Sequence, residues 1–81
     1  MLRMGKRTKQ TPQEILAKAT AFFGPGGIGL NIIPRGPHTL EFTGSGNDFV
    51  LVQAEPLENG TDIDVQTREW DYDVKRFLSE L

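Results

Sequence analysis

An Asn59-Gly60 pair between two β-rich segments places the tightest constraint on how this chain can fold. Asn and Gly both tolerate the positive φ angles of a two-residue turn, so the pair predicts a β-hairpin. The arm after the turn alternates, with Ile63 and Val65 on one face and polar side chains on the other. The arm before the turn does not alternate, because Phe49–Val52 is apolar on both faces. A strand of that kind is usually covered on each side, so its second face is a candidate for function.

A helix is predicted to begin at Pro12. Thr11 is suited to cap it, proline suits the first helical position, and Glu14 completes a capping box with Thr11. Gly24–Gly27 ends the helix. These glycines and Gly29 match G-x-G-x-x-G, but they follow a helix, whereas a dinucleotide-binding turn follows a strand. Apolar residues recur at helical spacing and predict one buried stripe: Ile15, Ala19, Phe22 and Phe23.

A second amphipathic helix is predicted within residues 68–81. Asp71 and Asp73 suit its first turn, where the helix dipole favours negative charge. Its apolar stripe is predicted to be Trp70, Val74, Phe77, Leu78 and Leu81.

Four strands are predicted between the helices. Ile28–Ile33 and Thr39–Thr43 come before the hairpin, and Pro56 is expected to mark where the first hairpin strand leaves the ladder. Short connections predict an antiparallel meander in chain order. We predict an α+β fold, a two-layer sandwich of order α-β-β-β-β-α with both helices on one face of the sheet. The predicted inward residues are Ile28, Leu30, Ile32, Leu40, Phe42, Val50, Val52, Ala54, Ile63 and Val65.

Charge divides the chain into a basic segment, residues 1–10, and an acidic domain, residues 11–81. The basic segment is predicted to be a flexible tail, and Met4 is an alternative start. The rest of the chain has five basic and eleven acidic residues, a balance of −6. The tail is either a solvated terminus or an arm for nucleic acid or another anionic surface, and the acidic domain argues against nucleic acid. Its candidate contact residues are Arg3, Lys6, Arg7 and Lys9.

The sequence shows no constellation of catalytic or metal-binding residues. His38 is the single histidine, and Ser45 and Ser79 lack the context of a nucleophile. Asp62 and Asp64 share a strand face but match no calcium loop. We therefore expect a non-enzymatic protein without cofactor or metal. The absence of cysteine and of any long apolar run predicts a cytoplasmic protein that does not enter a membrane.

The outer face of the predicted sheet is polar except at Ile33, Phe49 and Leu51. Leaving Phe49 and Leu51 in water would forgo roughly 3–5 kcal/mol of burial. Their cover is predicted to be a second copy or a protein partner, or alternatively a small apolar ligand. Two other readings need no partner: isolated exposed apolar residues are normal, and the tail can fold across the face.

The stretch from Thr67 to Tyr72, coming after an Asn-Gly hairpin, resembles the ends of small uncharacterised bacterial domains with this layout. The layout also resembles a shortened helix-grip (lipid-transfer-like) fold, or the sheet and helices of a TATA-binding-protein-like fold. The resemblance implies a fold but no catalytic motif. Three functions follow as hypotheses: a protein-interaction or self-associating module, a binder of a small apolar ligand, and a contact to nucleic acid through the basic tail.

Overall fold

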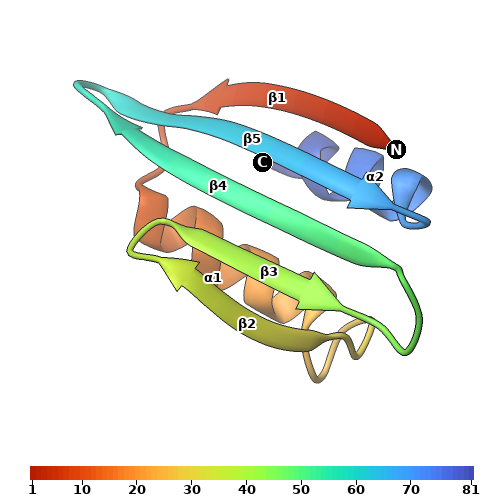
Figure 1. Ribbon diagram of the computed structural model, residues 1–81. Coiled ribbons are helices and arrows are strands. Elements are labelled where there is room, and N and C mark those ends of the chain that lie inside the picture. The colour runs from red at the N-terminus through yellow and green to blue at the C-terminus, as the bar shows by residue number, and fades with distance from the viewer.

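The computed structural model describes all 81 residues as an antiparallel sheet and two helices (Figure 1). The elements in chain order are β1 (Leu2–Thr8), α1 (Pro12–Phe23), β2 (Asn31–Gly36), β3 (Thr39–Thr43), β4 (Phe49–Leu57), β5 (Gly60–Arg68) and α2 (Asp71–Ser79). The order of the strands across the sheet is β1-β5-β4-β3-β2. The predicted α+β class and the antiparallel meander from β2 to β5 are confirmed.

The number of strands was predicted wrongly, because the sheet has five strands and not four. The fifth strand is β1, and it comes from the segment that the sequence analysis assigned to a flexible tail. It pairs with β5 in an unbroken antiparallel register, from Leu2 opposite Thr67 to Thr8 opposite Thr61. Leu2 and Met4 lie on the half-buried face of this segment and Arg3 and Arg7 on the exposed face, which is the pattern of a half-buried strand.

Two strand boundaries also differ from the prediction. β2 starts at Asn31 rather than Ile28, because hydrogen bonds tie the chain after α1 back to the helix end, with the N–H groups of Ile28 and Leu30 donating to carbonyls of α1. β4 continues through Pro56, which still lies opposite Thr61 in the ladder.

Helix α1 forms as its sequence predicts. The Thr11 N–H donates to Glu14 Oε1 at 2.9 Å, and the Glu14 N–H donates to Thr11 Oγ1 at 3.2 Å, which completes the capping box. Helix α2 has no such side-chain cap at its start. Near its end, Lys6 Nζ of β1 donates to the carbonyl oxygen of Leu78 at 2.7 Å. A cation at a helix C-terminus is favourable, so β1 and α2 stabilise each other.

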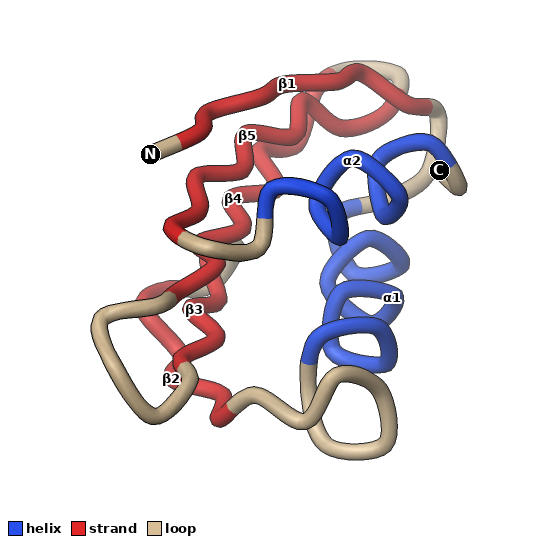
Figure 2. The backbone as a smooth tube through the Cα atoms, turned by 90° about the vertical axis from the view of Figure 1, so that its right-hand side faces the viewer, coloured by secondary structure: helices blue, strands red, loops and turns tan.

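The core lies between the sheet and the helices, and Figure 2 shows both helices on the same side of the sheet. Three aromatic rings connect the layers: Phe23 lies 5.5 Å from Phe42 and 5.2 Å from Phe77 between ring centroids. The buried apolar residues of the sheet are Leu30, Phe42, Val50, Val52, Ala54, Ile63 and Val65, all of them predicted to face inward; Leu30 just precedes β2. Ile28, Ile32 and Leu40 pack against them and are partly buried.

The Asn59-Gly60 turn is held by β1 as well as by its own backbone. Gly60 has a φ of +149°, which side chains rarely adopt. A Cβ at this position would lie 2.1 Å from the carbonyl oxygen of Thr8. The buried Thr61 hydroxyl then donates to the carbonyl oxygen of Gln10 at 2.6 Å. Two independent constraints therefore require glycine at position 60: the positive φ of the turn, and the close approach of the β1 backbone at Thr8.

Candidate interaction surface

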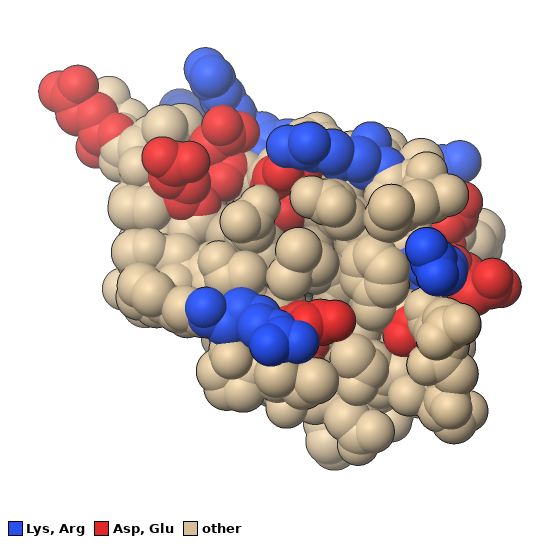
Figure 3. Space-filling model, viewed as in Figure 1, with Lys and Arg blue, Asp and Glu red and all other residues tan.

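The face of the sheet opposite the helices has no element covering it, and it is the face turned to the viewer in Figures 1 and 3. We call it the open face. Uncharged atoms occupy most of its middle, while Lys and Arg atoms line the edge over β1 (Figure 3). The three apolar residues that were predicted for the outer face, Ile33, Phe49 and Leu51, lie on this open face.

Phe49 and Leu51 lie next to each other on this face, in the central strand β4. In the ladder, Leu51 is flanked by Glu41 and Gln66, and Phe49 by Thr43 and Arg68. Both side chains are half-buried by these neighbours alone. We call Phe49 and Leu51 the apolar pair.

Ile33 is also half-buried on the open face but does not touch this pair in the ladder. Glu41 stands between Ile33 and Leu51. Arg35 donates to Glu41 Oε1 at 2.7 Å, so a charged pair separates the two apolar positions. The structure thus joins two of the three predicted residues and keeps the third apart.

The most exposed large apolar side chains are not those that the sequence singled out. Met1 is 81% exposed, Tyr72 72% and Leu57 42%. Leu57 ends β4 and, with Arg7, Thr8, Lys9 and Asn59, lines a hollow beside the hairpin turn. Leu57 was missed because Pro56 was expected to end its strand.

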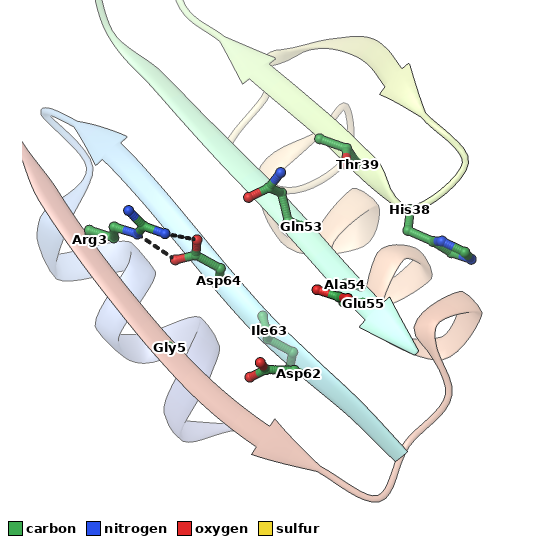
Figure 4. Close-up of a pocket in the computed structure, with 10 residues that line it drawn as sticks. All are labelled: Arg3, Gly5, His38, Thr39, Gln53, Ala54, Glu55, Asp62, Ile63 and Asp64. Atoms are coloured by element: carbon green, nitrogen blue, oxygen red, sulfur yellow. Dashed lines mark hydrogen bonds and ion pairs between the residues drawn. The ribbon is translucent and has the colours of Figure 1, made fainter. Parts of the chain in front are cut away.

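A polar hollow of about 570 Å³ lies on the open face, over β1, β5 and β4 (Figure 4). Its floor includes Gly5, which has no side chain to fill the space between strand neighbours. Arg3 crosses its rim and binds Asp64 through two hydrogen bonds, of 3.1 Å from Nε and 2.8 Å from Nη2. The other polar side chains lining the hollow are His38, Thr39, Gln53, Glu55 and Asp62.

The four basic residues of the first segment are divided by the strand. Arg3 and Arg7 point to the open face, where Asp64 and Asp62 face them, with an Arg7–Asp62 distance of 3.9 Å. The hydrogen bond from Arg3 to Asp64, followed by their Coulombic attraction, raises the pKa of Arg3. Lys6 points to the helix side, and Lys9 follows the strand. The structure therefore presents a basic strand edge and not a free arm.

Asp48 fixes the corner where the β3–β4 turn meets the start of α2. Its carboxylate accepts from the Gly46 N–H at 3.0 Å and from Trp70 Nε1 at 3.0 Å. These two hydrogen bonds, the first more than the second, lower the pKa of Asp48. Glu69, which directly precedes Trp70, has a φ of +84°, and this is unusual for a residue with a side chain.

The residues considered for catalysis or metal binding lie apart. His38 is in the β2–β3 turn, Ser45 is in the β3–β4 turn, and the Ser79 hydroxyl donates to the carbonyl oxygen of Arg76 at 2.7 Å. In Figure 4 the ring of His38 points away from the carboxylates of β5. No group of three or more His, Asp or Glu side chains is arranged to hold a metal ion.

An apolar hollow of about 370 Å³ lies between the ends of the two helices. It is lined by Phe22, Phe77, Leu81 and Ala21, with Lys18 and Glu80 at its rim. The guanidinium of Arg76 stacks over the Phe22 ring at 5.1 Å. This hollow lies on the helix layer and not between helices and sheet, where the core residues are packed.

Comparison with known proteins assigns no family to this chain. No protein-family model matches it, and neither the curated proteins nor the solved structures contain a match. The helix-grip and TATA-binding-protein-like resemblances therefore stay predictions. Neither helix has the length and apolar character that crossing a bilayer requires.

Proposed function

We propose that this protein is a non-catalytic interaction module that associates with a second copy of itself through the open face. The observation that carries the proposal is the position of the apolar pair, Phe49 and Leu51. They lie side by side on the central strand of the sheet, on the face that no helix covers. A twofold axis that passes close to Leu51 would bring the pair of one copy onto the pair of the other, as an isologous interface requires.

The size of the open face supports such a dimer. The molecule extends 37 × 20 × 19 Å, so the face has a projected area of roughly 740 Å² (37 × 20). A standard stable interface buries about 800 Å² on each partner. An interface of that size would need the whole of the open face, and the apolar pair would lie toward the end of the face where β4 begins and β5 ends.

The charges of the open face support a second copy over a strongly charged partner. By strand alternation, the face carries four basic residues (Arg3, Arg7, Arg35 and Arg68) and four acidic ones (Glu41, Glu55, Asp62 and Asp64), so its charges cancel. Two of the basic residues are already within 2.8 Å of a carboxylate oxygen. Two neutral faces meet without the like-charge repulsion that would oppose self-association.

Sedimentation over a concentration series tests the proposal. We expect the wild-type protein to dimerise below about 1 mM, and we expect Leu51→Glu to weaken the dimer at least about tenfold because it buries a charge where the two apolar pairs would meet. Gln13→Glu is the matched control, since it adds the same charge at an exposed position of α1, on the opposite side of the sheet from the proposed interface. A strict monomer, or equal dimerisation of the Leu51→Glu variant, would contradict the proposal.

Binding of a small apolar ligand is a second candidate, and the hollow between the helix ends favours it. Its volume lies within the range of ligand sites, and aromatic and aliphatic side chains line it. An anilinonaphthalene sulfonate dye provides the test: Ala21→Glu should abolish binding, whereas Ala17→Glu, one turn earlier on an exposed position of α1, should not. Equal dye binding by both variants would reject this candidate.

Nucleic-acid binding is a weaker candidate, because residues 11–81 have five basic and eleven acidic side chains, and this balance of −6 repels the long phosphate backbone of a nucleic acid. We infer a cytoplasmic location from the absence of cysteine, which suits a reducing compartment.

A further inference from the structure

The two edges of the sheet differ in their ability to accept another strand. β1 and β2 each have one neighbour in the sheet. β2 contains Pro34, and its register shifts between Pro34 and Gly36, so its free side does not offer a regular ladder. β1 has seven residues, no proline and an unbroken register against β5. In both Figure 1 and Figure 2, no helix or strand lies beyond it.

The free side of β1 offers backbone groups for pairing. Alternate residues of an edge strand direct their N–H and C=O groups away from the sheet, which makes the edge a template for a further strand. Natural edges are often blocked by a proline, a bulge or a covering loop. None of these protects Leu2–Thr8, and only the charges of its side chains limit what can pair with it.

Those charges are all positive. Arg3, Lys6, Arg7 and Lys9 are the only charged side chains in the first ten residues. The side chains of Arg3 and Arg7 remain 70% and 78% exposed although each faces a carboxylate of β5. Gly5 lies between them on the same face, so both guanidiniums have room to move toward a partner on the free side.

The existing pairing with β5 shows which sequence β1 accepts. β5 places Asp64 opposite Gly5 and Asp62 opposite Arg7, which are alternate positions on one face. Arg3 reaches diagonally across to Asp64 with two hydrogen bonds. A strand on the other side of β1 with carboxylates at alternate positions would meet the same two guanidiniums from the opposite direction.

A second copy of β1 is a poor occupant of this edge. The antiparallel register that pairs all seven residues sets Leu2 opposite Thr8 and Gly5 opposite Gly5 of the other copy. It also sets Arg3 opposite Arg7, once on each side of the twofold axis. Like charges directly opposite on neighbouring strands are destabilising, so the edge disfavours its own sequence.

We propose that the free edge of β1 binds an extended acidic peptide segment of another protein as a sixth strand of the sheet. Its backbone pairs with β1, and carboxylates at alternate positions contact Arg3 and Arg7 on the open-face side. Main-chain hydrogen bonds provide affinity and the alternate side chains provide selectivity, as in other cases of strand addition. This site does not include the apolar pair, but it shares Arg3 and Arg7 with the open face, so the peptide and a second copy would compete for them.

The test is fluorescence anisotropy with a labelled peptide of the length of β1, in which Glu alternates with Val and Thr. We expect saturable binding to the full-length protein at low salt. A peptide with the same side chains but N-methylated backbone amides should bind at least about tenfold more weakly, as should a peptide with Gln in place of Glu. Arg7→Glu should weaken binding by a similar factor. Lys75→Glu, the same charge change on an exposed position of α2, should leave it unchanged.

Four results would overturn the proposal. Equal binding of the N-methylated peptide would show charge attraction without strand addition, and equal binding of the Gln peptide would show that acidity is not recognised. A peptide that dissociates a dimer of the Leu51→Glu variant, in which the open-face contact is weakened, would assign the edge to a second copy. A DNA duplex that binds more tightly than the peptide and displaces it would assign the edge to nucleic acid. Circular dichroism of the Arg7→Glu variant establishes that a loss of binding is not a loss of fold.

Discussion

Strand β4 carries large apolar side chains on both of its faces, but only one face is packed against a second layer. On the helix side, Val50 and Val52 of β4 are fully buried. On the open side of the same strand, Phe49 and Leu51 are covered only by their ladder neighbours. Strand alternation alone separates these residues, yet one set holds the protein together and the other is available for binding. An apolar side chain on a strand therefore belongs to the core only where a second layer, here the two helices, packs against it.

The largest expected effect compares two phenylalanines on opposite faces. Phe42→Ala removes a fully buried ring that contacts Phe23 across the layers, and it should lower the free energy of unfolding by about 3–5 kcal/mol. Phe49→Ala, on the open face, should lower it by less than about 1 kcal/mol in the monomer. Urea unfolding of both variants at low protein concentration measures the difference. Equal losses would mean that the open face is part of the core.

A smaller effect compares two neighbouring basic residues of β1 that point to opposite faces. Lys6→Met removes the hydrogen bond to the end of α2, at 2.7 Å, and should cost about 1 kcal/mol. Arg7→Met removes a 3.9 Å contact with Asp62 in which the arginine is exposed, and should cost less than about 0.5 kcal/mol. Urea unfolding measures both. A larger loss for Arg7 would show that the acidic residues of β5, and not the helix end, hold β1 in place.

The third effect is the pH dependence of the corner where the two layers meet. The pKa of Asp48 is lowered in the folded protein, so its contribution to stability is complete above the pKa of the unfolded chain, near 3.8. That contribution is lost as the pH falls from about 4 through the lower pKa of the folded state. Urea midpoints at pH 7, 4 and 2.5 should therefore decline less steeply for Asp48→Asn than for the wild type. Parallel declines would place the acid sensitivity elsewhere, for example at Glu14, whose pKa the Thr11 cap also lowers.

Local signals predicted most of the fold and much of the candidate surface. The capping box set the start of α1, the Asn59-Gly60 turn set the hairpin, and alternation placed Phe49 and Leu51 on the face without helices. These features depend on residues close in sequence, whose geometry the side chains themselves determine.

Local signals could not predict two features: the pairing of β1 with β5, and the separation of Ile33 from Leu51 on the open face. β1 pairs with a strand about sixty residues later, and no turn joins the two to announce the pairing. Its one available signal is the alternation of Leu2 and Met4 with Arg3 and Gly5, which is short and is interrupted by Lys6 on the apolar face. The separation of Ile33 from Leu51 depends on Glu41 and on the exact pairing of three strands, which alternation within one strand does not determine.

The pairing of β1 with β5 has a consequence for how the chain is made. On the ribosome, the first strand emerges before any residue of its partner has been synthesised, and Thr67 must emerge before Leu2 can pair with it. Contacts so distant in sequence also form slowly, because closing the intervening loop costs entropy. Of the five strands of this sheet, β1 is thus the one that waits longest for its neighbour. Until then, the like charges of Arg3 and Arg7 disfavour pairing with the same segment of another chain.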